Sequence, residues 1–338
     1  MCAMEIIKNA SLKDLNTFGV QANAKNFTEI HNLNDIEALL EWKTQNDLPS
    51  LLLGGGSNLL FKNDYEGLVA KVCLFGKDVA DEDDDYVYVS AAAGENWHDF
   101  VRWTVEKGYS GLENLSYIPG TVGAAPIQNI GAYGVELADC FYTLQAVNLE
   151  NADVLEFDKA HCQFAYRESF FKSQALDKLL ITSVTFALPK KPTWKIDYAG
   201  VCDALEGQTP TAALISDAII KLRQSKLPDP KVIGNAGSFF KNPVLSLNDW
   251  DALKESNPDL SGYSQENGEM KISAAWLIDS CGWKGFRQGD AGVSDKHALV
   301  LVNHAEAIGA ELWNVAQQIM TSVEDKFGVS LEAEPRVI

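Results

Sequence analysis

The sequence lacks the long apolar run that a membrane-spanning helix needs. No stretch of its 338 residues approaches the ~20 apolar residues required to cross a bilayer. The first segment, Met1–Asn9, also lacks the basic flank and apolar core of a secretion signal. We therefore expect a cytoplasmic protein without a membrane partner.

Positive charge is also scarce, with 28 Lys and Arg against 47 Asp and Glu and a net charge of -19. Such a field repels nucleic acid and anionic lipid, so we expect neither as a partner. An anionic small substrate would need a local cluster of Lys and Arg. We interpret the acidic run at 81–85 as a solvated loop, because consecutive carboxylates do not converge on one metal ion.

Closely spaced cysteines are absent, and the five histidines are equally dispersed. No pair has the spacing typical of a metal or redox site, so we expect no metal. Buried free thiols are the better interpretation in a reducing compartment. The six cysteines are Cys2, Cys73, Cys140, Cys162, Cys202 and Cys281.

The length exceeds that of one ordinary core, and helical and strand-like patterns alternate along the chain. We predict a helix over 34–48, capped by Asn34 with Glu37 completing a capping box, and further helices near 96–107, 212–225, 272–281 and 305–327. Strands are predicted at 51–53, 86–92, 142–149, 179–188 and 298–303. The pattern indicates an α+β fold with mixed sheets, and the proline-rich break at 226–230 is the best domain boundary.

Two glycine-rich loops are the clearest functional signal. The strand at 51–53 runs into Gly54–Asn58, which has neither P-loop nor dinucleotide spacing and fits a tight turn or an anion nest equally well. The second loop, Tyr117–Pro126, lies in a long segment that fits neither period. Two such loops favour a long ligand with a central diphosphate, which FAD fits; structural turns are the alternative.

Six segments, in order from residue 16 to residue 336, resemble UDP-N-acetylenolpyruvoylglucosamine reductases of the longer subtype with a tyrosine loop. They are Asn16–Gly19, Gly54–Asn58, Tyr117–Gly134, Tyr166–Ser169, Gly234–Pro243 and Leu331–Arg336. The Pro-Gly-Thr-Val-Gly and Gly-Ser-Phe-Phe-Lys-Asn-Pro segments are specific together. The resemblance implies NADPH-dependent reduction of UDP-N-acetylglucosamine enolpyruvate to UDP-N-acetylmuramate through non-covalent FAD, in peptidoglycan precursor synthesis and hence in cell wall biogenesis, cell shape and cell division.

The resemblance also implies a multi-domain flavoprotein. Its FAD-binding region would be of the two-part vanillyl-alcohol-oxidase/PCMH type, with residues 1–75, joined by the C-terminal segment 331–338, as one part and 76–227 as the other. Residues 228–330 would form a separate α+β substrate domain. The expected partners are the UDP-sugar enolpyruvyl ether and NADPH, and the expected state is a monomer.

Three catalytic residues follow from the resemblance. Ser238 would donate a proton, and Arg167 suits the binding of a carboxylate that gains charge. Glu334 would bond the other side of that carboxylate or orient Arg167. The alternatives are a serine that merely bonds backbone, an ion pair of Arg167 with Glu168, and Glu332 in place of Glu334.

The resemblance assigns binding residues as well. Arg223 could instead lie on a solvated helix face, and Tyr198, in a loop at 194–200, could be an ordinary loop tyrosine. Lys226 and Lys241 would supply the positive charge that a uridine diphosphate needs. The implied cofactor residues are Gly54, Gly55, Gly56, Ser57, Asn58, Leu59, Pro119, Gly120, Thr121, Gly123, Ala124, Ala125, Gly131 and Arg223, and the implied substrate residues are Tyr166, Tyr198, Lys226 and Asn242.

One departure concerns Glu334, because Pro335 follows it where a β-branched residue is usual in the family, and the chain stops at Ile338. Two rival functions stay open. An oxidase of the same flavin-binding class often attaches FAD through His or Cys, yet Gly54–Asn58 contains neither and His98 is a poor candidate. A catalytically dead sugar-nucleotide binding protein would lack one of the three catalytic residues, all of which are present.

Overall fold

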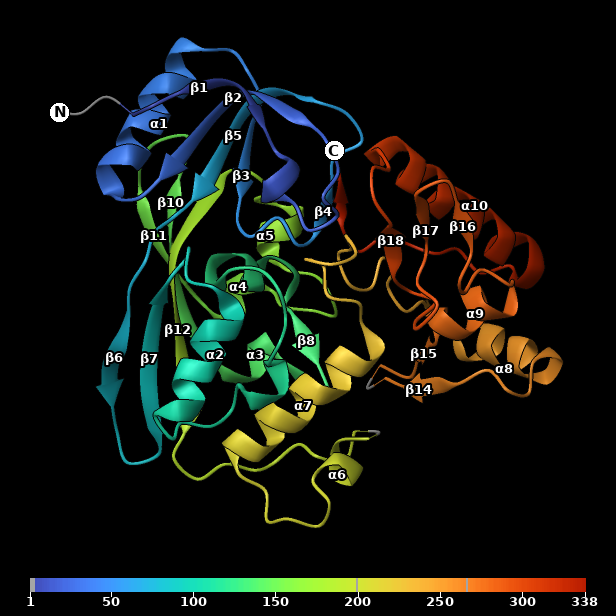
Figure 1. Cartoon of the computed structure of the whole chain (residues 1–338). Coiled ribbons are helices and arrows are strands. Elements are labelled where there is room, and N and C mark those ends of the chain that lie inside the picture. The colour runs from blue at the N-terminus through green and yellow to red at the C-terminus, as the bar shows by residue number, and fades with distance from the viewer. Residues whose placement is uncertain (1–3, 199, 266) are drawn as a thin grey trace. The chain divides into compact units, whose positions relative to one another are not determined.

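The structure is a computed structural model that describes residues 4–198, 200–265 and 267–338 (Figure 1). The chain divides into two compact units, which are described separately below. Unit 1 comprises 1–10, 24–56 and 65–225, and unit 2 comprises 11–23, 57–64 and 226–338. The expected free thiol of Cys2 lies outside the described residues.

The first sheet of unit 1 has four strands in the order β1-β2-β5-β3, with β2, β5 and β3 parallel. Helix α1 lies beside this sheet (Figure 1), and Ile30 and Leu68 of the strands share a buried cluster with Ile36 and Leu39 of the helix. A helix that returns the chain to a parallel strand is the usual connection in such a sheet. The bounds are Ile7–Ser11 for β1, Asn23–Ile30 for β2, Leu33–Gln45 for α1, Ser50–Leu53 for β3 and Tyr65–Val72 for β5.

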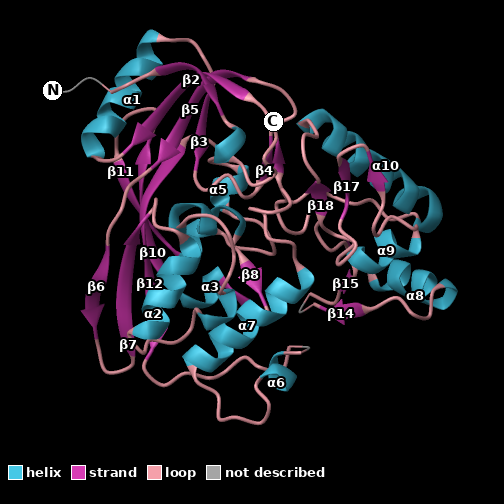
Figure 2. Cartoon of the chain, in the orientation of Figure 1, coloured by secondary structure: helices cyan, strands magenta, loops and turns pink. Residues whose placement is uncertain are grey.

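The second sheet of unit 1 is antiparallel, in the order β11-β10-β12-β7-β6. Alternating apolar residues bury one face of β7, and Trp97 and Phe100 of helix α2 pack on the same core. The strands are Lys77–Glu82 for β6, Tyr86–Ala92 for β7, Phe141–Asn148 for β10, Val154–Asp158 for β11 and Leu179–Pro189 for β12 (Figure 2).

Helices and a short hairpin complete unit 1, where Asn96 caps α2 through its side chain. Gly111–Leu137, predicted to follow neither period, consists of short 3-10 turns and the two-residue strands β8 and β9. The bounds are Trp97–Glu106 for α2, Glu113–Leu115 for η2, Val122–Gln128 for η3, Gly131–Ala132 for β8, Val135–Glu136 for β9, Leu137–Cys140 for α3, Lys159–Cys162 for α4, Phe170–Ser173 for α5, Val201–Ala204 for α6 and Ala212–Lys226 for α7.

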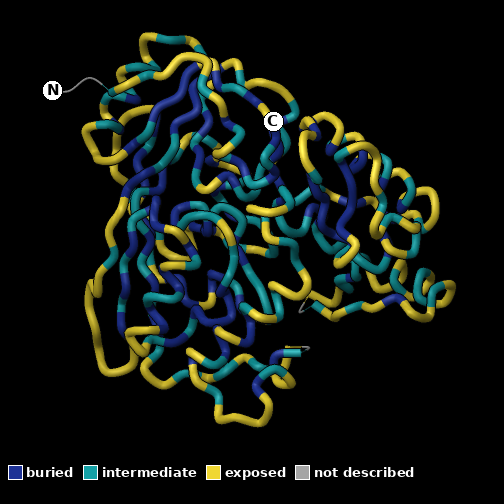
Figure 3. Tube along the Cα trace, in the orientation of Figure 1, coloured by how far each residue is buried: buried dark blue, intermediate teal, exposed yellow. Residues whose placement is uncertain are grey.

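Unit 2 combines three small sheets with three helices, and its buried core includes Phe18, Phe239, Leu277 and Ile319 (Figure 3). Phe18 and Phe239 meet edge to face with ring centroids 6.1 Å apart. The bounds are Lys13–Leu15 for η1, Leu59–Leu60 for β4, Val244–Leu245 for β13, Leu247–Ser256 for α8, Gly262–Ser264 for β14, Met270–Ile272 for β15, Ala274–Ser280 for α9, Arg287–Gln288 for β16, Ala291–Val293 for β17, Leu301–Asn303 for β18, Gly309–Phe327 for α10 and Arg336–Val337 for β19.

The predicted cap of the first helix is wrong. Asn32, not Asn34, caps α1: its side chain accepts hydrogen bonds from the amides of Asn34 and Asp35, and the Asp35 carboxylate accepts the Asn32 amide. The helix therefore starts earlier and ends at Gln45 instead of residue 48. Asn32 and Asn34 are both good capping residues, and only the extended backbone of Asn32 decides between them.

The acidic run was predicted as a loop, but Asp81 and Glu82 form the exposed end of strand β6. Asp83 begins the turn to β7 and accepts the amides of Asp85 and Tyr86. Hydrogen bonding to these amides is the main reason that the pKa of Asp83 is lowered. The run is thus a hairpin end stabilised by its own backbone, and its carboxylates do not converge.

The mixed content of helix and strand confirms the predicted α+β class. The strands of the first sheet all precede residue 75, and those of the second all follow it. The division into 1–75, 76–227 and 228–330 stays a prediction. Among the described residues, no helix combines the length and the apolar character needed to cross a membrane.

Candidate functional site

Two glycine-containing turns contact each other in unit 1. Strand β3 runs directly into Gly54 and Gly55. A methyl group on Gly54 would lie 2.7 Å from Oγ1 of Thr121, and one on Gly55 would lie 2.9 Å from Cα of Gly120. Any side chain here would collide with the other turn, so both positions require glycine. The two loops that the sequence singled out therefore form one continuous backbone surface.

The second turn is fixed by hydrogen bonds inside unit 1. The amides of residues 122–125 donate to the carbonyls of Glu95, Ala93 and Thr121 at 2.9 to 3.2 Å. Since these four donors are engaged, this turn offers shape and apolar surface to a cofactor rather than a row of N–H groups. Its predicted contacts at Gly123, Ala124 and Ala125 would accordingly be van der Waals contacts.

The last two residues of the first loop, Ser57 and Asn58, belong to unit 2, as does the predicted cofactor residue Leu59. Leu59 lies in β4, which pairs in parallel with β19. The Asn58 carbonyl accepts the amide of Arg336 at 3.0 Å, and the Asn58 side chain donates to the carbonyl of Glu334 at 3.4 Å. The predicted cofactor loop is thus continuous with the strand pairing that holds the predicted catalytic glutamate.

Arg223 does not lie on a solvated helix face, which was the alternative to a cofactor contact. Its Nε donates to the carbonyl of Tyr117 at 3.1 Å, beside the predicted cofactor residue Pro119. Burial lowers the pKa of Arg223, while nearby Tyr133 opposes that shift and Arg167 adds to it. A half-buried guanidinium beside this turn is suited to an anionic group.

Arg167 lies against the predicted cofactor residue Gly131. Its Nη2 donates to the carbonyl of Gly131 at 2.8 Å, and its guanidinium lies 5.2 Å from the ring centre of Tyr166. Arg167 also adopts a left-handed backbone with φ of 55°. A non-glycine residue in this region costs energy, and such strain concentrates at functional positions. The backbone directs the guanidinium to Gly131 and Tyr166.

Tyr198 packs on a second tyrosine of unit 1. The rings of Tyr133 and Tyr198 meet edge to face with centroids 5.5 Å apart, although half of Tyr198 is exposed. Asn114, which is buried, donates to the carbonyls of both Tyr133 and Lys195 and so ties the tyrosine loop to the β8–β9 hairpin. The tyrosine loop therefore contacts the β8–β9 hairpin, whose Gly131 carbonyl accepts a hydrogen bond from Arg167.

Ser238 and Glu334 are brought together in unit 2. Phe239, the residue after Ser238, accepts the amide of Glu334 at 2.8 Å, and Phe240 forms an antiparallel bridge with Ala333. Gly237, with φ of 70°, gives the chain the turn that presents Ser238. Both side chains are half-buried.

Lys241 distinguishes the surroundings of Glu332 from those of Glu334. The Lys241 amide donates to the Glu332 carbonyl, and its ammonium pairs with the Glu332 carboxylate. The Glu332 side chain is 70% exposed, whereas that of Lys241 is only 12% exposed. Glu332 therefore neutralises a buried lysine, and Glu334 is the better candidate for chemistry. Pro335 does not loosen Glu334, because Arg336 immediately beyond it is paired through β19.

The remaining predicted substrate residues surround helix α9 in unit 2. The Asn242 side-chain oxygen accepts the amide of Ala274 at the first turn of α9, which leaves its NH2 group as the part that can donate to a ligand. Lys226 lies close enough to His297 to lower the pKa of that imidazole. Asn242 thus lies at the start of α9, and Lys226 lies near His297.

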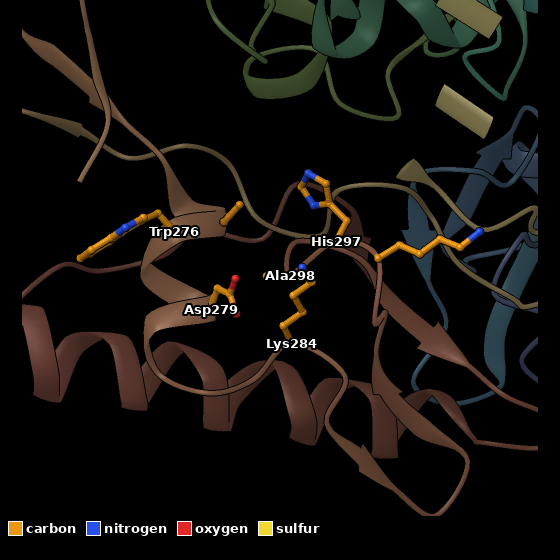
Figure 4. A pocket seen from close by; sticks show the side chains of 7 residues that line it. Trp276, Asp279, Lys284, His297 and Ala298 are labelled. Atoms are coloured by element: carbon orange, nitrogen blue, oxygen red, sulfur yellow. The ribbon is translucent and has the colours of Figure 1, made fainter. Parts of the chain in front are cut away.

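An open pocket of about 170 Å³ adjoins these residues (Figure 4). His297, Asp279 and Lys284 line it from different segments, and Trp276 extends to one side (Figure 4). Burial is the main reason that the pKa of His297 is lowered, and Lys226 and Lys284 lower it further. The lining residues are Ala275, Trp276, Asp279, Lys284, Lys296, His297 and Ala298.

Sequence reasoning missed this pocket. Its basic residues, Lys284, Lys296 and His297, belong to none of the matched motifs and converge only through the fold. The sequence does show a local concentration of positive charge here, because three lysines and arginines fall within 284–296 in a chain that has few. Such a local cluster is what an anionic substrate of this acidic protein requires.

One group of possible metal ligands exists elsewhere in unit 1. The donor atoms of Glu29, His31 and Cys73 lie within 4.8 Å of one another. The Glu29 carboxylate already pairs with Lys71 at 3.0 Å and His31 at 3.2 Å, and the hydrogen bond to Lys71 is the main cause of its lowered pKa. Burial raises the pKa of the Cys73 thiol. A neutralised carboxylate and a protonated thiol fit an ion-pair network better than a cation site.

Comparison with known proteins defines the class first. Residues 24–158 match the family described as FAD binding domain, and residues 229–338 match the C-terminal domain of UDP-N-acetylenolpyruvoylglucosamine reductase. The glycine turns that exclude any side chain lie largely within the first match. The chain is therefore an FAD-containing oxidoreductase.

The relatives define the family. UDP-N-acetylenolpyruvoylglucosamine reductase of Flavobacterium johnsoniae is 45% identical over 99% of this chain and 100% of its own length. The reductase of Burkholderia cenocepacia is 48% identical over 98% of this chain and 97% of its own. The chain belongs to the UDP-N-acetylenolpyruvoylglucosamine reductase family, which confirms the resemblance seen in its motifs.

A solved structure shares the fold. The chain superposes on the UDP-N-acetylenolpyruvylglucosamine reductase of Thermus caldophilus with a TM-score of 0.68 and 23% identity, over 99% of this chain and 98% of the other. At this identity the likeness concerns the fold alone.

Proposed function

We propose that the protein reduces UDP-N-acetylglucosamine enolpyruvate to UDP-N-acetylmuramate with NADPH as the reductant, in peptidoglycan precursor synthesis. Family membership over nearly the whole chain supports the substrate. The observation that carries the chemistry is the pairing of Phe239 with Glu334, which holds the predicted proton donor Ser238 and the predicted acid on one backbone framework. A cytoplasmic location fits the five cysteines of the described residues, all of which are free thiols.

The residues of unit 1 fit FAD because two backbone turns meet where a Cβ atom would not fit. Gly54 and Gly55 would let a diphosphate approach the main chain, the turn at Pro119–Thr121 would supply the facing surface, and Arg223 would supply positive charge. When bound, FAD supplies the relay of hydride from NADPH to substrate. With no cysteine or histidine in the first loop, the proposed attachment is non-covalent.

The enol ether of the substrate is conjugated to a carboxylate, which fixes the direction of reduction. Hydride adds to the terminal carbon, and negative charge develops on the carbon that bears the carboxylate and on the carboxylate oxygens. Arg167 is proposed to bind this carboxylate, because a guanidinium fork stabilises two oxygens that gain charge together. Ser238 is proposed to deliver the proton that completes the reduction at the charged carbon.

Glu334 is proposed to assist either the carboxylate or Arg167. A protonated carboxyl can donate to an oxygen that gains charge, and an ionised one can orient a guanidinium. In both roles its position must be fixed before reaction, and the bonds from its own amide and from Arg336 provide this.

The uridine diphosphate is proposed to bind in unit 2. The cations at Lys226, Lys284 and Lys296 would offset the negative charge of the diphosphate, and the Trp276 ring offers a face for stacking. Asn242 and Tyr198 are proposed to contribute hydrogen bonds. This pocket would make binding sensitive to salt, since charge-assisted contacts between exposed groups are screened.

The direct test is NADPH oxidation with and without UDP-N-acetylglucosamine enolpyruvate. We expect oxidation that depends on the sugar nucleotide, with UDP-N-acetylmuramate as the product. Oxidation at the same rate without it, accompanied by oxygen uptake, would show instead that the protein is an oxidase.

The proton step is tested by Ser238→Ala. Flavin reduction by NADPH does not need this hydroxyl, so it should proceed at nearly the original rate. Reoxidation by the enolpyruvyl substrate should slow by ~10²–10⁴-fold, the usual contribution of a positioned acid. Ser238→Cys should recover part of the loss. Rapid mixing separates the two halves through the flavin spectrum, and failure of both halves together would mean that Ser238 only maintains the turn.

A further inference from the structure

Tyr117 enters the second cofactor turn in a conformation that a tyrosine rarely adopts. Its φ is 61°, in the left-handed region, which a residue with a Cβ occupies only at a cost in energy. Three residues later, the backbone of Gly120 contacts Gly55. The path of the turn toward the first glycine loop therefore depends on a backbone conformation that other groups must maintain.

Side chains from two helices of unit 1 maintain it. The Tyr117 amide donates to Nδ1 of His98 on α2 at 3.0 Å, and the Tyr117 carbonyl accepts from Nε of Arg223 on α7 at 3.1 Å. The rings of His98 and Tyr117 also meet edge to face, 5.5 Å between centroids. Both peptide groups of this strained residue are thus satisfied by side chains rather than by a backbone ladder.

The bond to His98 requires one protonation state. Nδ1 accepts a hydrogen bond only when it carries no proton, so the imidazole must be neutral with its proton on Nε2. Burial lowers the pKa of His98; Asp99 on the same helix raises it, and Arg102 on α2 and Arg223 on α7 lower it further. The surroundings therefore favour the form that the bond needs.

The helices themselves are tied together beside this bond. Arg102 of α2 donates to the hydroxyl of Ser216 and to the carboxylate of Asp217, both on α7. The Ser216 hydroxyl lies 2.7 Å from that of Ser116, the residue before Tyr117. His98 and Arg223 thus approach Tyr117 from elements that cannot move independently.

We propose that His98 is a positioning residue of the flavin site, whose neutral imidazole holds Tyr117 and thereby the Pro119–Gly120 turn in the shape that binds FAD. Protonation of His98 would break this bond and weaken flavin binding at acid pH. The inference rests on the cofactor role proposed for the two glycine turns, and it assigns His98 a function other than covalent attachment.

Two substitutions separate the hydrogen bond from the ring contact. His98→Asn places an amide oxygen near the position of Nδ1, so it can accept the Tyr117 amide but does not titrate. His98→Phe keeps an aromatic ring against Tyr117 and removes the acceptor. The dissociation constant of FAD is measured from pH 5 to pH 8 through the fluorescence that flavin regains when it leaves the protein.

We expect the Kd for FAD of the unaltered protein to rise about 10-fold between pH 8 and pH 5, because the half-buried Tyr117 amide loses its acceptor. His98→Asn should bind FAD within about 3-fold of the original at pH 8 and lose the acid-induced weakening. His98→Phe should bind about 10-fold more weakly at every pH. Wild-type affinity in His98→Phe, or an unchanged acid response in His98→Asn, would overturn the proposal.

The tautomer provides a second measurement that needs neither flavin nor activity. Nitrogen-15 NMR of labelled histidine should show His98 neutral with its proton on Nε2 and a titration midpoint below 6.5, the value of an unperturbed imidazole. A proton on Nδ1 at neutral pH would refute the hydrogen bond directly, even if His98→Phe failed to fold. A lack of NADPH oxidation with the sugar nucleotide would instead contradict the proposed reaction and leave both His98 measurements readable.

Discussion

The amide of Glu334 donates to the carbonyl of Phe239 at 2.8 Å, so two segments almost a hundred residues apart in sequence fix each other beside Ser238. The bond uses main-chain atoms, so it does not depend on the Glu334 side chain. The carboxylate of Glu332, two residues earlier, forms an ion pair with Lys241. Substituting either side chain should therefore preserve the framework and reveal which carboxyl the reaction needs.

We predict that Glu334→Gln slows reoxidation of the reduced flavin by the enolpyruvyl substrate by at least ~10²-fold, because a group positioned for the transition state is lost. The melting temperature should change little. Glu332→Gln is the matched control: it replaces the ionic partner of Lys241, whose side chain is only 12% exposed, so stability should fall by ~1–3 kcal/mol while the rate stays nearly unchanged. Stopped-flow spectroscopy and calorimetry measure the two quantities. A larger rate loss in the Glu332 variant would reverse the assignment.

The contact between the glycine turns predicts a rescue. Gly54→Ala should lower the melting temperature of flavin-free protein, because the new methyl meets Oγ1 of Thr121, at a cost of ~1–3 kcal/mol. Adding Thr121→Ala removes that oxygen and should restore part of the loss. Gly55→Ala meets the backbone of Gly120 instead, so Thr121→Ala should not rescue it. Equal behaviour of the two glycine variants in the double-mutant cycle would disprove this contact.

The anion site predicts a selective loss of substrate affinity. Lys226→Met should raise the Kd for the sugar nucleotide by about 10- to 150-fold, equivalent to the ~1.5–3 kcal/mol of a charge-assisted hydrogen bond, while FAD stays bound. Lys221→Met, an exposed lysine on the same helix, should leave both affinities unchanged. Isothermal titration calorimetry gives the values. If the two variants behave alike, Lys226 is an ordinary solvated lysine.

The pocket histidine predicts a pH-dependent stability. The pKa of His297 in the folded protein lies below 6.5, so the unfolded chain takes up a proton first as the pH falls. Its contribution is fully present above pH 6.5 and is lost as the pH falls from 6.5 through the folded-state pKa. His297→Gln should flatten the fall in unfolding free energy over this window. Urea titrations at several pH values measure it; an identical slope in the variant would show that His297 does not titrate as described.

Much of the fold follows from local patterns. Strand β7 follows from the alternation of Tyr86–Ala92, and α2 follows from Asn96 and its apolar face, because period and cap are local properties of the chain. The sequence also indicated that the close approach of another group requires glycine at Gly54 and Gly55, but it did not identify that group. That cause is the neighbouring turn at Gly120, which only the folded chain brings close.

The rest depends on contacts that no local pattern encodes. Lys241 neutralising Glu332, His98 and Arg223 bonding Tyr117, and the lysines around His297 all join residues that are distant in sequence. The cap at Asn32 was missed for another reason: Asn32 and Asn34 are chemically equivalent as caps, and the extended backbone of Asn32 decides between them.

The pairing of β4 with β19 has a consequence for synthesis. Asn58 and Glu334 are 276 residues apart, yet they share a hydrogen bond, and residues 11–23 and 57–64 belong to a unit whose remainder begins at residue 226. During synthesis, residues 11–23 and 57–64 lack their pairing partners until the later residues of unit 2 have left the ribosome. Residues 65–225 can meanwhile collapse on their own sheets. Residues 11–23 and 57–64 are therefore the part of the nascent chain most exposed to chaperones and proteases. Substitutions in these two segments should reduce the yield of protein in cells more than they reduce the stability of the folded protein.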